Sequence, residues 1–230
     1  MPDKIDVIVP VYNEEKSIKE FYRRIRSIPL QHNLIFIDNA STDNTLEIMR
    51  TFIDVVVIEH DKNEGYGASI CDGIANSKGE IIVIIDADCE YPPESIPEMI
   101  KQLETADVVY TSRFLDKRNF NMPFLKILGN RIISSVFNLL FRQNVTDLYT
   151  GCKALRRSVL SGIHLQRKGF EHVLEMAAYL AKKGATIDEI SVTFKQRRTD
   201  SSKMKHLTET LKFIYLAFYY FFKAESMIEK

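Results

Sequence analysis

Short apolar runs alternate along this chain with longer amphipathic stretches. The apolar runs cover residues 6–11, 34–37, 55–59 and 81–85, and polar residues follow each of them. Between them, residues 16–28, 45–52 and 68–76 carry apolar side chains at helical spacing. Unalternating runs of this length are typical of strands that are buried on both faces of a parallel sheet. The pattern therefore predicts an α/β fold with a Rossmann-like, mostly parallel sheet, helices on both faces and right-handed crossovers.

The run at residues 81–85 is the most regular of these strands, and two carboxylates follow it. All five residues are Ile or Val, and Asp86, Ala87 and Asp88 come next. Side chains two positions apart in an extended segment point the same way, so Asp86 and Asp88 can converge on one point. Ligands of such sheets bind beyond the carboxyl ends of the strands. A divalent cation, Mg²⁺ or Mn²⁺, would relieve the repulsion between two hard oxygen ligands. The alternative is that the two acids only cap the next segment.

Polar side chains also follow the first two strands, which places them on the same edge of the sheet. Tyr12 and Glu14 come after the first strand, and Asp38 and Asn39 come after the second. A dinucleotide site would need glycines after the first strand, and this chain has none there.

Two turn segments lead into the next helices. Ser41 or Thr42 is expected to cap the helix at residues 45–52, with Asp43 in its first turn. Gly65 and Gly67 precede the following helix without the spacing of a phosphate-binding loop. We interpret this pair as a turn that permits close packing, with a phosphate cradle as the alternative.

Length and charge limit the choices further. A chain of 230 residues, 45% of them hydrophobic, forms one large domain or one domain with an appendage. Its 31 basic and 31 acidic residues give a formal net charge of zero, so nucleic-acid binding is not indicated. The three cysteines, Cys71, Cys89 and Cys152, are far apart and favour a reducing compartment. The N-terminus begins a strand pattern at once, without a signal-peptide layout, which predicts an intracellular protein.

Four motifs in this order carry a family resemblance: VIVPVYNEE, IDNASTDNT, NEGYGASICDGIANSKGE and IIDADCEYPPE. The chain resembles the family 2 glycosyltransferases with the GT-A fold. Later segments are similar to the branch of dolichyl-phosphate mannose synthases and polyprenyl-phosphate glycosyltransferases; they are TSRF, GNRIISSVFNLLF, TDLYTGCKALRR, GFEHVLE and the basic stretch at 197–203. The resemblance covers about residues 4–204 and implies a catalytic domain over residues 1–204.

The resemblance also implies roles for single residues. The nucleotide-sugar site would consist of Pro10, Tyr12, Glu14, Ile37, Asp38, Asn39, Asp86, Ala87, Asp88, Arg113, Arg197 and Lys203. The metal ligands would be Asp86, Asp88 and Glu90. The acceptor phosphate would be bound by Arg113, Arg131 and Ser135. Catalysis would depend on Asp88, Arg113, Arg131, Arg197 and Lys203. Asn39 and Glu90 replace residues that are common in the family, which leaves the base and the sugar open.

The reaction implied by the resemblance is a metal-dependent, inverting transfer of a hexose, mannose or glucose, from a GDP- or UDP-sugar to a polyprenyl or dolichyl phosphate. Such an acceptor oxygen is already anionic and needs no general base. Asp147, Glu171 and Glu175 are therefore expected to be structural or to orient an arginine. The alternatives are a hydroxyl acceptor, a non-catalytic subunit that binds nucleotide sugars, and a phosphatase. The phosphatase is disfavoured because the Asp86 motif follows three other strands.

Two apolar segments bear on localisation. In residues 124–141, Arg131, Ser135 and Asn138 form a polar stripe beside a broad apolar surface. We predict an interfacial helix at 123–141 with this stripe toward the active site, or else an ordinary core-facing helix. The segment at 211–222 is apolar almost all round but too short to cross a bilayer, so the helix within 205–230 is expected to dock on the protein or lie at a membrane interface. We therefore expect peripheral attachment to the cytoplasmic face of a membrane; homo-oligomerisation stays open.

Overall fold

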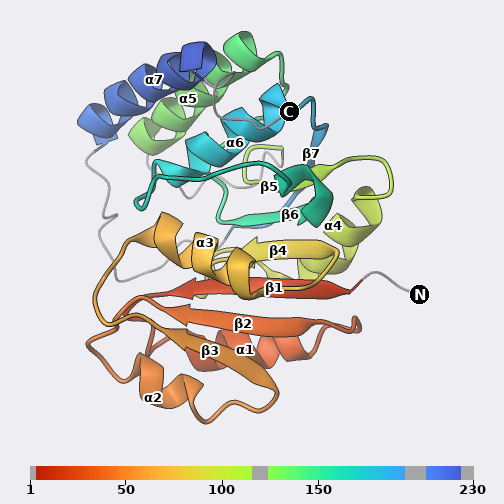
Figure 1. The fold of residues 1–230 in the computed structure, drawn as a ribbon, viewed down its shortest axis with the longest axis vertical. Coiled ribbons are helices and arrows are strands. Elements are labelled where there is room, and N and C mark those ends of the chain that lie inside the picture. The colour runs from red at the N-terminus through yellow and green to blue at the C-terminus, as the bar shows by residue number, and fades with distance from the viewer. Residues whose placement is uncertain (1–3, 116–123, 195–205, 224–230) are drawn as a thin grey trace.

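The computed structural model describes residues 4–115, 124–194 and 206–223, and its strands in these ranges form one sheet (Figure 1). The strand order is β3-β2-β1-β4-β6-β5-β7. The strands are β1 (Ile5–Val11), β2 (Asn33–Asp38), β3 (Val55–Glu59), β4 (Ile81–Ile85), β5 (Val108–Ser112), β6 (Cys152–Arg156) and β7 (Ile187–Ser191). β6 pairs antiparallel with β4 and β5, while the other described pairs are parallel.

Helices cover both faces of the sheet, as the sequence predicts. The helices are α1 (Ile18–Arg26), α2 (Thr45–Met49), α3 (Tyr66–Asn76), α4 (Ile96–Gln102), α5 (Phe124–Phe141), α6 (His172–Lys182) and α7 (His206–Lys223). Residues of α1, α2 and α4 share one apolar cluster, and residues of α3, α5, α6 and α7 share the other. Short 3₁₀ turns at Pro93–Ser95 and Arg157–Leu160 complete the described elements.

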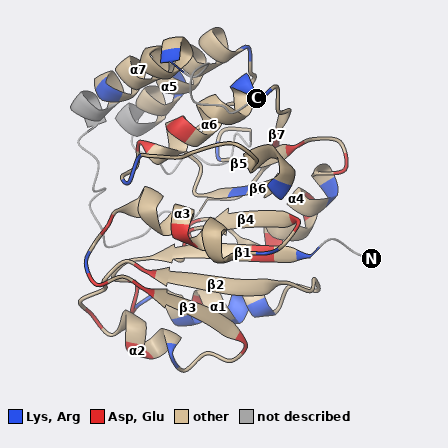
Figure 2. Cartoon of the chain, viewed as in Figure 1, with Lys and Arg blue, Asp and Glu red and all other residues tan. Residues whose placement is uncertain are grey.

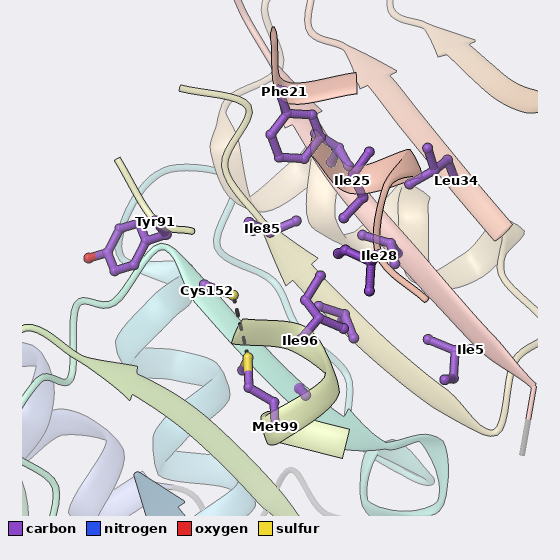
Figure 3. Close-up of a cluster of buried hydrophobic side chains, with 14 of the residues drawn as sticks. Ile5, Phe21, Ile25, Ile28, Leu34, Ile85, Tyr91, Ile96, Met99 and Cys152 are labelled. Carbon is purple, nitrogen blue, oxygen red and sulfur yellow. Dashed lines mark hydrogen bonds between the residues drawn. The ribbon is translucent and has the colours of Figure 1, made fainter. Parts of the chain in front are cut away.

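The central strand β4 contributes to both clusters because its side chains alternate between the two faces. Ile81, Val83 and Ile85 belong to the cluster with α1 and α4, whereas Ile82 and Ile84 belong to the cluster with α3 and α6. Figure 3 shows the first cluster, in which Ile85 lies among side chains of α1 and α4. All five β4 residues are buried, which explains the unalternating pattern in the sequence.

Two expectations about local structure need correction. The second helix ends at Met49 rather than at residue 52, and its N-cap is Asn44. Ser41 does not cap it, because Ser41 Oγ instead accepts a hydrogen bond from the backbone N–H of Asn13 at 3.0 Å. Asp43 lies just before the helix and accepts a hydrogen bond from the Thr45 N–H at 3.0 Å. The loop after β1 competes for the side chains that would otherwise cap α2.

The C-terminal helix is part of the fold. Phe213, Leu216, Ala217 and Tyr220 of α7 are buried in the cluster that α5 and α6 also line. Figure 1 shows α7 beside α5 at one end of the molecule, opposite α2. No helix in the described ranges is long and apolar enough to cross a membrane. Figure 2 shows Lys and Arg interspersed with Asp and Glu along the chain, in keeping with its zero net charge.

Candidate active site

Strand register brings the polar residues of three strands to one edge of the sheet. In β1, Pro10 pairs with Ile37 of β2, and Val11 pairs with Asp38. On the other side of β1, Ile8 pairs with Ile84 of β4. Two residues beyond this pair, Asp86 is therefore level with Pro10. Pro10 and Ile37 are buried, and β1 lies between β2, which ends in Asp38, and β4, which Asp86 follows.

The loops that follow β1 and β2 bind one another. The Glu14 N–H donates to Thr45 Oγ1 at 2.8 Å, and the Thr42 N–H donates to Asn13 Oδ1 at 2.7 Å. Asn13 has a φ of 56°, which asparagine tolerates better than most residues. Tyr12 and Glu14 are half-buried beside this junction. The two predicted nucleotide contacts that follow β1 therefore lie on a loop whose backbone is held by hydrogen bonds to the loop after β2.

Asp38 offers a buried acceptor at this edge. Its Oδ2 accepts a hydrogen bond from the Ser41 N–H at 3.0 Å, whereas its buried Oδ1 has no hydrogen-bond partner among the described residues. The neighbouring Asn39 is already engaged, because its Oδ1 accepts from the Glu64 N–H at 2.8 Å and lies 3.2 Å from His60 Nδ1. A buried acceptor without a donor is costly. Asp38 Oδ1 can therefore accept a hydrogen bond from a ligand. Asn39 instead joins this edge of the sheet to the loop before α3 through its hydrogen bond with Glu64.

Asp86 is fixed on both sides. The Tyr66 hydroxyl donates to Asp86 Oδ1 at 3.0 Å, and the Asp86 N–H donates to the carbonyl of Gly151 at 3.1 Å. Burial is the main cause that raises the pKa of Asp86 to about 6, while the hydrogen bond from Tyr66 and the charge of Lys153 oppose it. The charges of Glu90 and Glu14 act in the same direction as burial. Three carboxylates from two strand ends therefore affect one another here. A positive charge placed among them would remove the cost of ionising Asp86.

Lys153 is a buried cation close to this carboxylate. It lies on β6, where it pairs with Ile84 of β4 and Tyr110 of β5, and its side chain is fully buried. Burial lowers the pKa of Lys153 to about 8, although the charge of Asp86 acts in the opposite direction. The sequence analysis did not assign Lys153 a role. The signal was present, since a lysine stands in the otherwise apolar run Cys152–Leu155.

Asp88 and Glu90 form a tight turn after Asp86. The Glu90 N–H donates to Asp88 Oδ1 at 2.9 Å, and Cys89 between them has a φ of 59°. Asp86, Asp88 and Glu90 are half-buried. Within the described ranges, no three His, Cys, Asp or Glu side chains are arranged to hold a metal ion by themselves. Two carboxylates with substrate phosphate oxygens are a common Mg²⁺ site, so Asp86 and Asp88 fit a cation that arrives with a diphosphate.

Gly65 and Gly67 serve close packing, as the sequence analysis preferred. The Gly67 and Ala68 N–H groups donate to the Lys168 carbonyl at 2.7 and 3.2 Å. A Cβ on Gly67 would lie 2.3 Å from the Arg167 carbonyl, and one on Gly65 would lie 2.3 Å from that of Lys168. The start of α3 thus docks on the segment before α6. These N–H groups are therefore not available to a phosphate.

Arg113 was predicted to bind phosphate groups, and in the structure its guanidinium forms a buried ion pair with Asp147. Its Nε and Nη2 donate to the Asp147 carboxylate at 2.6 and 2.7 Å, and Asn130 Nδ2 donates to the same carboxylate at 2.8 Å. Burial opposes the charge, but Asp147 raises the pKa of Arg113 above its ordinary value. The rings of Tyr91 and Phe194 lie beside the guanidinium, with centroids at 5.6 and 5.3 Å. Asp147 therefore orients an arginine, as predicted.

The other two candidate bases are also engaged in structural contacts. Glu175 Oε2 accepts hydrogen bonds from the Gln166 and Arg167 N–H groups at 3.0 and 2.8 Å, and its Oε1 accepts from the Tyr220 hydroxyl at 3.2 Å. Glu171 pairs with Lys212 of α7. Both carboxylates join α6 and the loop before it to α7, so their expected structural role is confirmed.

The remaining predicted site residues lie in two places. Arg131 and Ser135 are exposed on α5, while their neighbours Asn130 and Ser134 are buried. The Ser134 hydroxyl donates to Asn130 Oδ1 at 3.1 Å. The polar residues that α5 buries thus precede the predicted Arg131 and Ser135 by one position each. Arg197 and Lys203 lie outside the described residues. The assignment of the acceptor phosphate to Arg131 and Ser135 stays a prediction.

A mostly parallel sheet with Asp-Ala-Asp after its central strand is the arrangement of a GT-A glycosyltransferase. Residues 6–163 match the model of "Glycosyl transferase family 2", and the chain belongs to this family.

Two similar proteins have names that agree with this family. The chain is 30% identical to a dolichol-phosphate mannosyltransferase of Pyrococcus furiosus over 92% of its own length and 63% of that protein's. It is also 30% identical to a UDP-N-acetylglucosamine–dolichyl-phosphate N-acetylglucosaminyltransferase of Methanococcus voltae, over 84% of this chain and 86% of the relative. The chain thus spans less than two thirds of the Pyrococcus relative.

Solved structures support the fold. Mannosyl-3-phosphoglycerate synthase from Rubrobacter xylanophilus superimposes with a TM-score of 0.75 at 15% identity, covering 99% of this chain and 77% of that one. Glucosyl-3-phosphoglycerate synthase from Mycobacterium tuberculosis, in complex with UDP, gives 0.71 at 19% identity, covering 100% and 82%. At these identities the likeness establishes the GT-A fold alone.

Proposed function

We propose that the chain is a metal-dependent, inverting glycosyltransferase that transfers a hexose, mannose or glucose, from a GDP- or UDP-sugar to a polyprenyl phosphate. The observation that carries this proposal is the meeting of Asp38, Asp86 and Asp88 at one edge of the sheet in a family 2 chain. The relatives from Pyrococcus and Methanococcus, whose names include dolichyl-phosphate acceptors, support the choice of acceptor.

The chemistry requires charge stabilisation at the leaving group. When the anomeric C–O bond breaks, the nucleoside diphosphate gains negative charge, and a bound Mg²⁺ or Mn²⁺ supplies a compensating charge. Asp86 and Asp88 present the carboxylates for that ion, with Glu90 close by. Asp38 Oδ1 is a buried acceptor for a donor group of the nucleoside. A phosphate acceptor needs no general base, which agrees with the structural roles of Asp147, Glu171 and Glu175.

The donor and acceptor can be identified in one experiment. Purified protein with Mn²⁺ or Mg²⁺ is given GDP-mannose, UDP-glucose or UDP-GlcNAc, with and without a polyprenyl phosphate, and sugar entering the organic phase is measured. Lipid-dependent transfer from one donor supports the proposal. Donor turnover without lipid, or transfer to a soluble hydroxyl, would contradict the proposed acceptor.

The role of the metal carboxylate is tested by Asp88→Ala. We expect this change to abolish transfer, whereas Asp188→Ala, which removes an exposed carboxylate on β7, should leave transfer unchanged. Metal-dependent transfer that persists in Asp88→Ala would refute the assignment.

We also propose that α5 and α7 rest on a membrane surface. Their exposed apolar side chains lie on neighbouring helices at one end of the molecule (Figure 1); they are Leu128, Ile132, Leu139, Leu211, Tyr215, Phe218, Phe221 and Phe222. An apolar surface of this kind, on helices that are not long and apolar enough to span a membrane, suits an interfacial contact. The predicted division into residues 1–204 and 205–230 stays a proposal, since α7 shares its core with α5 and α6.

Sedimentation with liposomes tests this contact. The double change Leu139→Ser and Phe222→Ser removes side chains that are 81% and 78% exposed, and it should reduce binding to vesicles that contain anionic lipid. Ile53→Ser is a matched control, because Ile53 is 72% exposed and follows α2 at the opposite end of the molecule. Equal binding of all three proteins would contradict the proposed surface.

A further inference from the structure

The hydroxyl of Tyr66 reaches the carboxylate of Asp86 from a helix that is distant in the sequence. Tyr66 is the first residue of α3, and its O–H donates to Asp86 Oδ1 at 3.0 Å. We propose that Tyr66 is a positioning residue that fixes the Asp86 carboxylate in the orientation needed for the divalent cation. This inference rests on the proposed metal role of Asp86 and adds a residue that the sequence analysis did not single out.

The direction of the Tyr66 side chain is determined by contacts on two sides. Gly65 and Gly67, its neighbours in the chain, pack directly against the carbonyls of Lys168 and Arg167, so the backbone at Tyr66 cannot shift without a clash. The ring stacks on Phe170 with centroids 5.1 Å apart and an interplanar angle of 15°. The hydroxyl at the end of this fixed ring therefore has one orientation, toward Asp86.

The chemistry of the two groups suits this hydrogen bond. A tyrosine hydroxyl carries one hydrogen that it can donate, and here it donates that hydrogen to Asp86 Oδ1. Asp86 accepts through Oδ1, and a carboxylate oxygen can accept a hydrogen bond while it also binds a cation.

The opposite side of the carboxylate is limited by Gly151. A Cβ at Gly151 would lie 2.2 Å from Asp86 Oδ2, and the backbone N–H of Asp86 donates to the Gly151 carbonyl at 3.1 Å. The carboxylate thus has Tyr66 at one oxygen and the backbone of Gly151 at the other. Carboxylates that bind metals are commonly oriented in this way by hydrogen bonds from residues that do not touch the ion, and loss of such a bond lowers metal affinity about 10- to 100-fold.

The test is the Mn²⁺ affinity of Tyr66→Phe, which removes only the hydroxyl and retains the stacked ring. Free Mn²⁺ is measured by electron paramagnetic resonance during titration of the protein with saturating GDP or UDP. We expect the dissociation constant for Mn²⁺ to rise about 10- to 100-fold, with no change in nucleotide affinity measured without metal.

Tyr22→Phe is the matched control for this change. Tyr22 also stacks on an aromatic ring, that of Phe52 at 4.0 Å, and its hydroxyl donates to the Ile53 carbonyl at 3.2 Å. It lies on α1 with no described contact to Asp86. We expect its Mn²⁺ affinity to equal that of the original protein.

A second variant keeps the proposal testable if Tyr66→Phe does not fold. Phe170→Leu removes the stacking partner, which is 48% exposed, and leaves the hydroxyl in place. An aromatic pair contributes about 0.5–1.5 kcal/mol, so we expect Mn²⁺ binding to weaken about 2- to 10-fold.

The outcomes separate this inference from the proposed function. Unchanged Mn²⁺ affinity in Tyr66→Phe overturns the inference. If the melting temperature falls while the Mn²⁺ affinity stays the same, the tyrosine has a purely structural role. If Tyr66→Phe cannot be purified, unchanged affinity in Phe170→Leu has the same meaning. If the original protein binds no Mn²⁺ with either nucleotide, the proposed metal site itself is wrong and the inference falls with it.

Discussion

Replacing Asp147 by asparagine should destabilise the protein strongly, because it removes a buried negative charge that pairs with Arg113. Asp147 is completely buried and Arg113 is 6% exposed. The Asp147 carboxylate accepts hydrogen bonds from the Arg113 N–H, Nε and Nη2 and from Asn130 Nδ2. Asparagine retains the shape but presents an NH₂ group to some of these donors, and it removes the negative charge that pairs with the guanidinium.

The expected size of this effect is about 3–5 kcal/mol, the usual cost of removing one partner of a buried ion pair. That is a large part of a typical domain stability of about 5–15 kcal/mol. Urea unfolding should therefore show a clearly lower midpoint for Asp147→Asn. The chain has no tryptophan, so the transition is best followed by far-ultraviolet circular dichroism.

Two further proteins make the measurement decisive. Glu94→Gln breaks the Arg24–Glu94 pair, in which Glu94 is 52% exposed, and should cost at most about 1 kcal/mol. The double change Arg113→Met and Asp147→Leu removes both buried charges, so it should be more stable than Asp147→Asn. If Asp147→Asn costs no more than Glu94→Gln, or if the double variant is the least stable, the reasoning about this ion pair is refuted.

Three other predictions concern a histidine, a glycine and an arginine. Burial lowers the pKa of His172 to about 3, so only the unfolded state gains a proton on it below about pH 6.5, and the free energy of unfolding should fall by about 1.4 kcal/mol per pH unit as the pH drops from that value toward 3. His172→Gln should lower the slope between pH 6.5 and 5 by that amount and leave the opposite contribution of Asp86, whose raised pKa of about 6 lies in this window; an unchanged slope in urea unfolding would contradict the assignment. Gly67→Ala should cost about 1–3 kcal/mol because its Cβ meets the Arg167 carbonyl, whereas Gly129→Ala in α5, whose nearest neighbour is a hydroxyl, should be neutral or stabilising by up to about 1 kcal/mol. Equal unfolding midpoints for these two variants would argue against the close packing. Arg131→Ala should raise the KM for polyprenyl phosphate and spare donor binding; equal loss of both would exclude an acceptor role.

Local patterns predicted the N-terminal half of the fold well. The five β-branched residues of β4 favoured a strand buried on both faces, which the structure confirms, and the polar residues after each strand located the edge that carries Asp38 and Asp86. The ends of the helices were predicted less accurately than the strands. α2 ends at Met49, and beyond it the Thr51 and Phe52 N–H groups donate to carbonyls only three residues back, which is a turn rather than an α-helix. At the other end, Ser41 accepts a hydrogen bond from the loop after β1 instead of capping the helix.

The C-terminal half was harder to predict for two physical reasons. β6 reads CKALR, in which a buried Lys153 interrupts the apolar pattern, so neither the strand nor its antiparallel direction was evident. In α5, apolar residues occupy most of the circumference, and the sequence therefore did not fix the rotation of the helix. Asn130 and Ser134 point inward, while Arg131 and Ser135, chosen from the resemblance, are exposed.

Contacts between distant loops were not predictable at all. The docking of Gly67 on Lys168 and the reach of Tyr66 to Asp86 depend on the placement of the segment before α6. The residue spacing within each segment does not predict this contact, because the start of α3 and the segment before α6 are far apart in the sequence and meet only in the folded protein.

The position of β6 between β4 and β5 has a consequence for synthesis on the ribosome. When residues 1–85 have emerged, β1 and β2 can already pair with their neighbours, but the partner on the other side of β4 has not been made. Until Cys152–Arg156 appears, β4 is an edge strand of five apolar residues, the kind of edge that pairs with other chains. Nascent or truncated chains that end before β6 should therefore aggregate or require a chaperone, while chains that extend through β6 have this edge covered.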